Sequence, residues 1–471
     1  MAAPIYYKAI VVAGISWMSL TNGYLYGQMT GMVSALQKHD EGIFLNESEI
    51  YWIATSVTTI ALAGLMFAAL IADKIGRRWS FIACSIIMTI NFIVLYIANN
   101  MFMFMLSRTT AGIAVGGLTS LCICVTSEYI SSKDRGFFLN MITTVSPAIG
   151  TGFGHLLGII LHWRNVALIG VLFSIIGVIL PYFWVESPHW LASRGMFSEC
   201  ELSFRKLHGK SSSTEKELRV LIKLESCKLD ATTSTNIFSK LLLASKRRYF
   251  WELIVLSMVI YAYMAAAGKL IFSVLATVML EEITGTSDVL FFTLLVDGLI
   301  FLGSLLSCVL IRKVSMRNLL FSTGFIGNAV LIILSACLYY KTDEVYFQWI
   351  NVSLLALYFI ILNAGPYPVS EALMGELFPL DLKLYCIFIS GIALVCFLTL
   401  SVMLFPLIIA YLGYHGMFLI NVAIMSLSLG YIWIKLPETK GRTLQEIEVY
   451  FKTKEFDVAE ALNNVHVKSL I

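Results

Sequence analysis

The sequence contains few charged residues for its length. Of 471 residues, 13% are Asp, Glu, Lys or Arg, whereas 58% are hydrophobic, and the mean hydropathy is +0.82. Soluble domains carry about 25% charged residues, and a soluble chain of this size could not hide so much apolar surface from water. The composition excludes a soluble enzyme, a nucleic-acid-binding protein and a disulfide-stapled secreted domain. It indicates a chain that lies mainly in lipid.

Several other features are scarce or absent. There are nine prolines against 32 glycines, a balance that suits closely packed membrane helices. The nine cysteines fall mostly in apolar runs and show neither metal-ligand spacing nor a disulfide framework. The sequence also contains no Gly-x-x-x-x-Gly-Lys-Ser/Thr loop for ATP. We therefore expect no metal, no cofactor and no covalent chemistry, and hence no enzyme.

Long runs without Asp, Glu, Lys or Arg predict membrane spans, because a spanning helix needs about 20 mostly apolar residues. They cover about 9–36, 50–72, 79–107, 109–127, 136–163, 165–185, 249–280, 287–311, 318–340 and 345–370. The last run, Leu384–Ile434, has 51 residues, and Gly413-Tyr414-His415-Gly416 predicts a turn between two spans within it. The sum is twelve spans.

This pattern predicts an all-α membrane protein with twelve transmembrane helices in two six-helix halves. We expect an N-terminal half at 1–185, a cytoplasmic linker at 186–248, a C-terminal half at 249–435 and a cytoplasmic tail at 436–471. The linker is polar, and its simplest interpretation is a tether between the halves. Its middle, Glu215 to Lys228, is expected to form short surface helices.

The basic residues indicate the orientation. If both termini are cytoplasmic, 28 Lys and Arg residues lie inside and three lie outside, which follows the positive-inside rule. Asn46-Glu47-Ser48 is then an N-glycosylation sequon on the outer side, with Asn46 as the acceptor. We expect a multi-pass protein of the plasma membrane.

Charged motifs recur at equivalent places in the two halves. Glu128 precedes Arg135 by seven residues, and Glu376 precedes Lys383 by seven residues. Each half also ends in a related segment, which begins at Glu186 in the first half and at Glu438 in the second. The offsets are 248 and 252 residues, so the chain contains an internal repeat. Parallel six-helix halves with a binding site between them produce such a repeat.

Three longer segments complete the pattern: Asp73-Lys74-Ile75-Gly76-Arg77-Arg78, Glu186-Ser187-Pro188-His189-Trp190-Leu191 and Pro437-Glu438-Thr439-Lys440-Gly441-Arg442-Thr443. Together these motifs resemble those of the sugar porters of the major facilitator superfamily. Within that family the chain is similar to the facilitative hexose and insect trehalose-type carriers. The resemblance covers Gly23 to Gln445 and implies alternating access, with cytoplasmic acids and bases that lock the two halves. Carried across, the lock residues are Asp73, Lys74, Gly76, Arg77, Arg78, Arg108, Glu128, Arg135, Glu186, Glu376, Lys383 and Glu438.

The chain departs from the family pattern at two kinds of position. In the second-half copy of the Asp73 loop, Arg312 replaces an acid, Ser315 a glycine and Met316 an arginine, so we expect an altered lock. Leu25 stands where proton-coupled members carry an aspartate. Since leucine cannot titrate, passive facilitation is favoured.

The expected substrate site departs further, because the family's span-seven glutamines fall on Met264 and Ala265. Ionisable residues within spans are functional candidates. Lys269 and Glu371 either pair to hold two spans together or contact the solute, and Asp297 is interpreted as structural. The candidate substrate-binding residues are Gln28, Thr151, His155, Lys269 and Glu371.

We predict a facilitative transporter for a small sugar, either a hexose or a trehalose-like sugar. Its expected partners are this solute and the lipid bilayer, with no nucleic acid, and we expect a monomer. Three alternatives remain open: a proton-coupled symporter, a sugar sensor that does not transport, and a carrier of a non-sugar polar solute.

Overall fold

The computed structural model describes residues 2–37, 43–231, 242–269, 289–340, 345–379, 382–453 and 456. Within these ranges the regular structure is helical. The first group of helices, the N half, comprises α1 (Ala2–Gln37), α2 (Glu47–Ile75), α3 (Arg77–Ile97), α4 (Met101–Tyr129), α5 (Arg135–Asn140), the π-helix η2 (Met141–Val145), α6 (Ser146–Ile160), α7 (Trp163–Ile179) and the 3-10 helix η3 (Leu180–Phe183).

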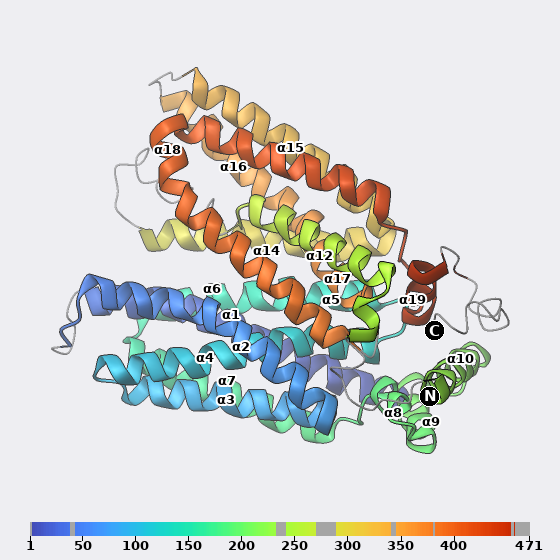
Figure 1. The fold of residues 1–471 in the computed structure, drawn as a ribbon. Coiled ribbons are helices and arrows are strands. Elements are labelled where there is room, and N and C mark those ends of the chain that lie inside the picture. The colour runs from blue at the N-terminus through green and yellow to red at the C-terminus, as the bar shows by residue number, and fades with distance from the viewer. Residues whose placement is uncertain are drawn as a thin grey trace.

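Three linker helices follow, namely α8 (Pro188–Ser193), α9 (Phe197–His208) and α10 (Ser212–Ala231). The second group, the C half, comprises α12 (Arg248–Ala266), α14 (Val289–Lys313), α15 (Met316–Tyr339), α16 (Val345–Ala364), α17 (Pro366–Glu376) and α18 (Lys383–Lys435), and α19 (Leu444–Thr453) comes after it. The two groups lie side by side, and the linker helices and α19 gather at one end (Figure 1).

Ten helical segments of the described residues are long and apolar enough to cross a membrane. Helix α1 and the continuous segment α5–η2–α6 complete the twelve-helix arrangement, so the predicted all-α fold with two six-helix halves is confirmed. The turn predicted within 384–434 is present, because Gly413 interrupts α18 with a φ of 67°. Only glycine adopts such a left-handed conformation readily.

The boundary between the third and fourth spans differs from the sequence prediction. The apolar runs suggested a division at Arg108, but α3 ends at Ile97 and α4 begins at Met101. The side chain of Asn100 accepts a hydrogen bond from the Met103 N–H at 2.9 Å and thereby caps α4. Arg108 therefore lies two turns inside α4. Its single charge interrupts the apolar run without ending a helix.

The predicted seventh span, 249–280, is seen as α12 up to Ala266. Gly268 has a φ of 66°, which ends the regular helix. The hydroxyl of Tyr358 in α16 donates to the Ala267 carbonyl at 2.9 Å, so this carbonyl has a partner at the break. The remainder of the predicted span, 270–280, lies outside the described residues.

Helices α1 and α6 pack unusually closely, because small residues face one another along their contact. A side chain at Gly27 or Gly154 would overlap the backbone of the facing helix. Membrane helices use this small-residue contact to associate without a hydrophobic driving force. It fixes Tyr24 in the N-half core, where the Tyr24 hydroxyl donates to the Val166 carbonyl at 2.6 Å.

We call the end of the bundle that carries the 73–78 loop, α8–α10 and α19 the basic end. The first residues described in α1 and the last residues of α19 both lie there (Figure 1). The linker helices have a small core of their own, built around Leu191, Cys200, Phe204 and Leu221. The predicted helices at 215–228 are a single helix, α10. The linker is therefore more than a tether.

Candidate functional site

The turn between α2 and α3 is built around the Glu186 carboxylate. Gly76 has a φ of 90°, and a side chain there would overlap Glu186. The carboxylate accepts hydrogen bonds from the backbone N–H groups of Arg77 at 2.8 Å, Arg78 at 3.3 Å and Ser187 at 2.9 Å. Burial raises the pKa of Glu186, while these N–H groups act in the opposite direction. The motif at the end of the N half thus holds the start of α3.

Arg77 and Glu128 form a buried salt bridge within the N half. The Nη2 and Nε atoms of Arg77 donate to the carboxylate at 3.0 and 3.1 Å, and Nη1 donates to the Ala72 carbonyl at 3.1 Å. The hydroxyl of Ser187 also donates to Glu128, at 2.5 Å. Arg77 is 7% exposed and Glu128 is 1% exposed. The charge of Glu128 is therefore neutralised by its own half.

Asp73 joins this turn to the linker. Its carboxylate forms a salt bridge with Arg194 at 2.8 Å, and its carbonyl accepts a hydrogen bond from the Trp190 ring N–H at 3.1 Å. Both partners belong to the segment that begins with α8. Lys74 is exposed and forms no salt bridge with another residue of the described ranges. Of the two, only Asp73 has a visible structural role.

The two halves are joined at the basic end by buried charged groups. Arg135 donates from Nε to Glu376 at 2.8 Å and from Nη2 to the Arg442 carbonyl at 2.7 Å. Lys383 donates to the Ser127 hydroxyl at 2.8 Å and to the Gly375 carbonyl at 2.7 Å. Arg135, Glu376 and Lys383 are at most 2% exposed. These contacts close the basic end.

The C-half copy of the Glu186 turn uses Glu438. The carboxylate of Glu438 accepts hydrogen bonds from the N–H groups of Arg317 at 3.2 Å and Lys440 at 3.0 Å. Met316 occupies the position of Arg77 and contacts the Thr439 hydroxyl through its sulfur at 3.8 Å. The C-half copy therefore keeps the turn but lacks a counterpart of the Arg77–Glu128 salt bridge.

Arg108 lies apart from this network. It is 20 residues from Glu128 on the same helix, a separation of about 30 Å at the α-helical rise. Its guanidinium lies 3.2 Å from the Met29 sulfur and donates to the Ser107 hydroxyl at 3.1 Å, and it is 1% exposed. The contacts of Arg108 thus belong to the interior of the N half and not to the charged groups at the basic end.

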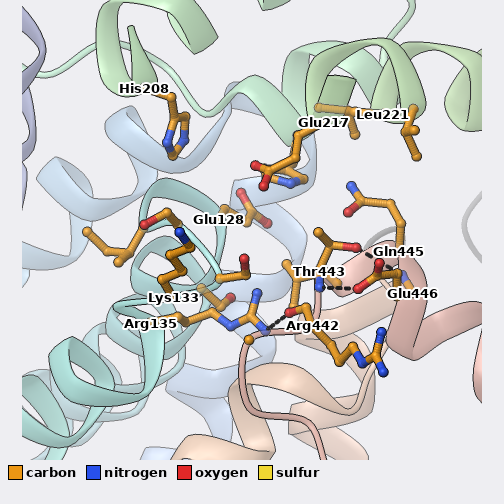
Figure 2. A pocket seen from close by; sticks show the side chains of 18 of the residues that line it. Glu128, Lys133, Arg135, His208, Glu217, Leu221, Arg442, Thr443, Gln445 and Glu446 are labelled. Carbon is orange, nitrogen blue, oxygen red and sulfur yellow. Dashed lines mark hydrogen bonds between the residues drawn. The ribbon is translucent and has the colours of Figure 1, made fainter. Parts of the chain in front are cut away.

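A cavity of about 680 Å³ lies at the basic end, and Figure 2 shows the side chains that line it. Lys133 and Arg135 come from the N half, His208 and Glu217 from the linker helices, and Glu446 from α19. Burial lowers the pKa of His208 to about 3. Burial and the charge of Glu446 raise the pKa of Glu217. The N half, the linker and the segment that leads into α19 thus enclose one polar space.

A second contact between the halves involves His155. Its Nδ1 atom lies 2.6 Å from a carboxylate oxygen of Asp297 in α14, and its Nε2 atom lies 3.1 Å from the Thr30 hydroxyl in α1. The His155 and Asp297 side chains are 12% and 16% exposed. Nearer the basic end, the same face of α5–α6 meets α14 where Asn140 donates to the Cys308 sulfur at 3.3 Å. The His155 contact thus joins the two halves farther from the basic end than the Asn140 contact does.

Near Asp297 lies a group of ionisable and aromatic side chains, which we call the central cluster. The ammonium of Lys269 lies 4.3 Å from the centroid of the Tyr367 ring, and the carboxylates of Glu371 and Asp297 act on it at longer range. Tyr26 in α1 lies near Tyr367 and is 40% exposed. The cluster combines groups from both halves.

The remaining two candidates differ from each other. Gln28 is 2% exposed, and its side-chain nitrogen has no hydrogen-bond partner among the described residues. The hydroxyl of Thr151 donates to the Gly23 and Pro147 carbonyls at 3.2 and 2.9 Å. Gln28 therefore has an unused donor, whereas Thr151 serves the α1–α6 contact.

Sequence reasoning did not identify Tyr26, Thr30 or Tyr367 and did not find the His155–Asp297 contact. The available signal was spacing within α1, since Tyr26 and Thr30 are four residues apart and therefore share one face of the helix. A contact between α6 and α14 involves residues 142 positions apart, and no local pattern encodes that pairing.

Comparison with known proteins places this geometry in a family. A family model described as sugar (and other) transporter matches residues 11–451. A facilitated trehalose transporter of Polypedilum vanderplanki is 23% identical over 94% of this chain and 88% of its own length. The facilitated trehalose transporter of Apis mellifera ligustica is 24% identical with the same coverage.

Solved structures agree in fold. The proton:xylose symporter XylE bound to 6-bromo-6-deoxy-D-glucose superimposes with a TM-score of 0.80 at 18% identity, covering 95% of this chain and all of that chain. The inward open conformation of XylE from E. coli gives a TM-score of 0.63 at 17% identity, covering 94% and 99%. The chain is thus a multi-pass membrane carrier and not an enzyme. It belongs to the sugar transporter family of the major facilitator superfamily.

Proposed function

We propose that the chain is a facilitative carrier that moves a small sugar, a hexose or a trehalose-like disaccharide, by alternating access. The supporting observation is that the central cluster gathers groups of both halves beside the His155–Asp297 contact, while Arg135–Glu376 joins the halves at the basic end. A solute bound at the cluster can leave through the basic end only when the Arg135–Glu376 contact breaks.

Passive transport is supported by Leu25, which is 1% exposed within the N-half core. Its side chain cannot carry a proton through the cycle. We propose Gln28, His155, Lys269 and Glu371 as the substrate-binding set and add Tyr26 and Tyr367. Thr151, whose hydroxyl donates to two carbonyls of the N half, supports this set by holding α6 against α1. Buried sugar hydroxyls need hydrogen-bond partners, and aromatic rings give the sugar an apolar surface on which to pack.

The basic end is cytoplasmic in this proposal, because 28 basic residues on that side follow the positive-inside rule. Both termini then lie in the cytoplasm, Asn46 is exposed on the outer side as a glycosylation acceptor, and the protein acts as a monomer in the plasma membrane. We retain the division into a half at 1–185, a linker at 186–248, a half at 249–435 and a tail at 436–471.

A second candidate function is proton-linked sugar transport. It is favoured by the direct His155–Asp297 contact at 2.6 Å, which joins two proton-exchanging side chains from opposite halves. In this version this pair carries the proton that accompanies the sugar.

Radiolabelled uptake into proteoliposomes tests both candidates. Glucose, fructose, trehalose and one amino acid are compared, with and without an inward proton gradient. Saturable sugar uptake that ignores the gradient supports the facilitator. Uptake that rises with the gradient and loses this dependence in His155→Gln supports the symporter. Folded protein that moves none of the sugars contradicts both.

A further inference from the structure

The two halves use the same turn at the basic end, and this allows their positions to be matched in space. Arg78 and Arg317 correspond, because each donates its backbone N–H to the acid of its own motif, Glu186 or Glu438. Each also donates from Nη2 to a carbonyl near the end of its half, that of Tyr182 at 2.7 Å or Trp433 at 2.8 Å. The residue before each is therefore equivalent. Met316 stands where the N half has Arg77.

This replacement changes the surroundings of the equivalent acids. Glu128 has a bidentate partner in its own half, Arg77. Glu376 has its salt bridge with Arg135 of the other half, and its second carboxylate oxygen has no hydrogen-bond partner among the described residues. Lys383 acts on Glu376 only through space, because its hydrogen bonds go to Ser127 and Gly375.

Met316 also contacts the opposite half directly. A side chain at Gly136 would overlap the Met316 methyl group, which shows how closely the methionine packs on the start of α5. Met316 is 3% exposed. At this position the N half has an ion pair within itself, Arg77–Glu128. At the equivalent position the C half has an apolar contact, Met316–Gly136, that joins the two halves.

We propose that Met316 is a positioning residue that makes Glu376 depend on Arg135, so that the carrier rests closed at the basic end and opening of that end limits transport. Separation of the halves removes the salt bridge of Glu376 but keeps the Arg77–Glu128 salt bridge. Met316 simultaneously loses its contact with Gly136, so both effects favour the closed state.

The test is Met316→Arg, with Met316→Leu as the matched apolar control. An arginine here gives Glu376 a partner that remains when the halves separate. We expect the opening equilibrium at the basic end to rise about tenfold, the factor that corresponds to about 1.4 kcal/mol. Hydrogen–deuterium exchange of peptides spanning 127–140 and 370–385, measured in nanodiscs without sugar, reports this opening directly. Met316→Leu should leave the exchange unchanged.

Coupling to Glu376 separates this role from a general packing effect. In a Glu376→Gln background, Met316→Arg should no longer increase exchange, because no carboxylate remains to be compensated. An equal increase in both backgrounds, or no increase in Met316→Arg, overturns the proposal. If the arginine variant does not fold, Met316→Lys introduces the same charge on a chain close to methionine in length. Glu376→Gln alone should also loosen the basic end, although less than Arg135→Ala does, because Arg135 also donates to the Arg442 carbonyl. Unchanged exchange in Glu376→Gln overturns the proposal too.

The transport part rests on the proposed function, and uptake measurements distinguish the two failures. Met316→Arg should raise the maximal sugar uptake rate if opening of the basic end is limiting, while Met316→Leu should not. If exchange changes as expected but no variant takes up sugar, the role of Met316 in opening the basic end is supported and the sugar assignment is contradicted.

Discussion

Glu128 and Glu376 show how strongly the immediate surroundings decide the role of a residue. Both are buried carboxylates at equivalent positions of the repeat, and each precedes a base by seven residues. Glu128 forms its salt bridge inside the N half, whereas Glu376 forms its salt bridge across the interface. The first carboxylate stabilises one half, and the second controls whether the halves stay together.

Arg77→Ala is therefore expected to reduce the stability of the protein. The substitution leaves the buried Glu128 without its salt bridge, and removing one member of a buried pair costs about 3–5 kcal/mol. Thermal unfolding in detergent checks this, with Lys74→Ala as the control because Lys74 is exposed on the same turn. Equal melting temperatures for Arg77→Ala and Lys74→Ala would contradict the structural role of Arg77.

The substrate-binding candidates can be separated by paired substitutions. His155→Ala removes a charge-assisted contact of about 1.5–3 kcal/mol, and sugar uptake should change by about tenfold or more. Thr151→Ala removes hydrogen bonds to backbone carbonyls inside the N half. The free energy of unfolding should therefore fall by about 1 kcal/mol, while the KM for sugar uptake stays the same. A raised KM in Thr151→Ala would instead support direct contact between Thr151 and the solute.

Elements of the fold were predictable where the signal was local. Apolar runs identified the spans, and the Gly413 turn was visible because two spans cannot join without a break. The division between α3 and α4 was misplaced, because a single arginine interrupts an apolar run more visibly than the capping Asn100 does. The structure of the linker was underestimated, since the small core around Leu191 and Phe204 depends on contacts between separate short helices.

The linker also gives a prediction about pH. Burial lowers the pKa of His189 to about 4 and of His208 to about 3, whereas the unfolded histidine titrates near about 6.5. The unfolded chain then binds more protons below about pH 6.5, so stability is complete above this value and decreases as the pH falls toward the folded pKa values.

Melting measured at pH 7 and pH 5 checks this expectation. The decrease in melting temperature should be smaller in His208→Gln, which removes one of the two groups. His415→Gln, at the opposite end of the bundle, is the matched control and should behave like the unsubstituted chain. The same decrease in all three proteins would show that the linker histidines do not control acid stability.

At the scale of the whole molecule, the halves meet through residues that are distant in sequence. Arg135 and Glu376 are 241 positions apart, and His155 and Asp297 are 142 apart. The family resemblance indicated which residues belong to the lock, but it did not pair Arg135 with Glu376 of the other half. Its partner across the interface depends on how two folded halves dock. That docking register cannot be inferred from a motif within either half.

A cross-link tests whether these contacts must separate during transport. Arg135→Cys and Glu376→Cys are combined in a chain whose native cysteines are replaced, and the pair is joined with a short cleavable dithiol reagent. Sugar uptake should fall to background and return after reduction, because the joined halves cannot open at the basic end. Each single cysteine variant serves as the control. Persistent uptake in fully cross-linked protein would contradict alternating access through this interface.

The hydrogen bond from Arg135 to the Arg442 carbonyl has a practical consequence. It ties the segment just before α19 to the N half, so this segment must change its surroundings whenever the basic end opens. A fluorophore placed on the outer face of α19, paired with a second on α10, would therefore convert each opening into an optical signal. The labelled carrier would thus report its own opening, and both fluorophores would lie away from the path of the solute.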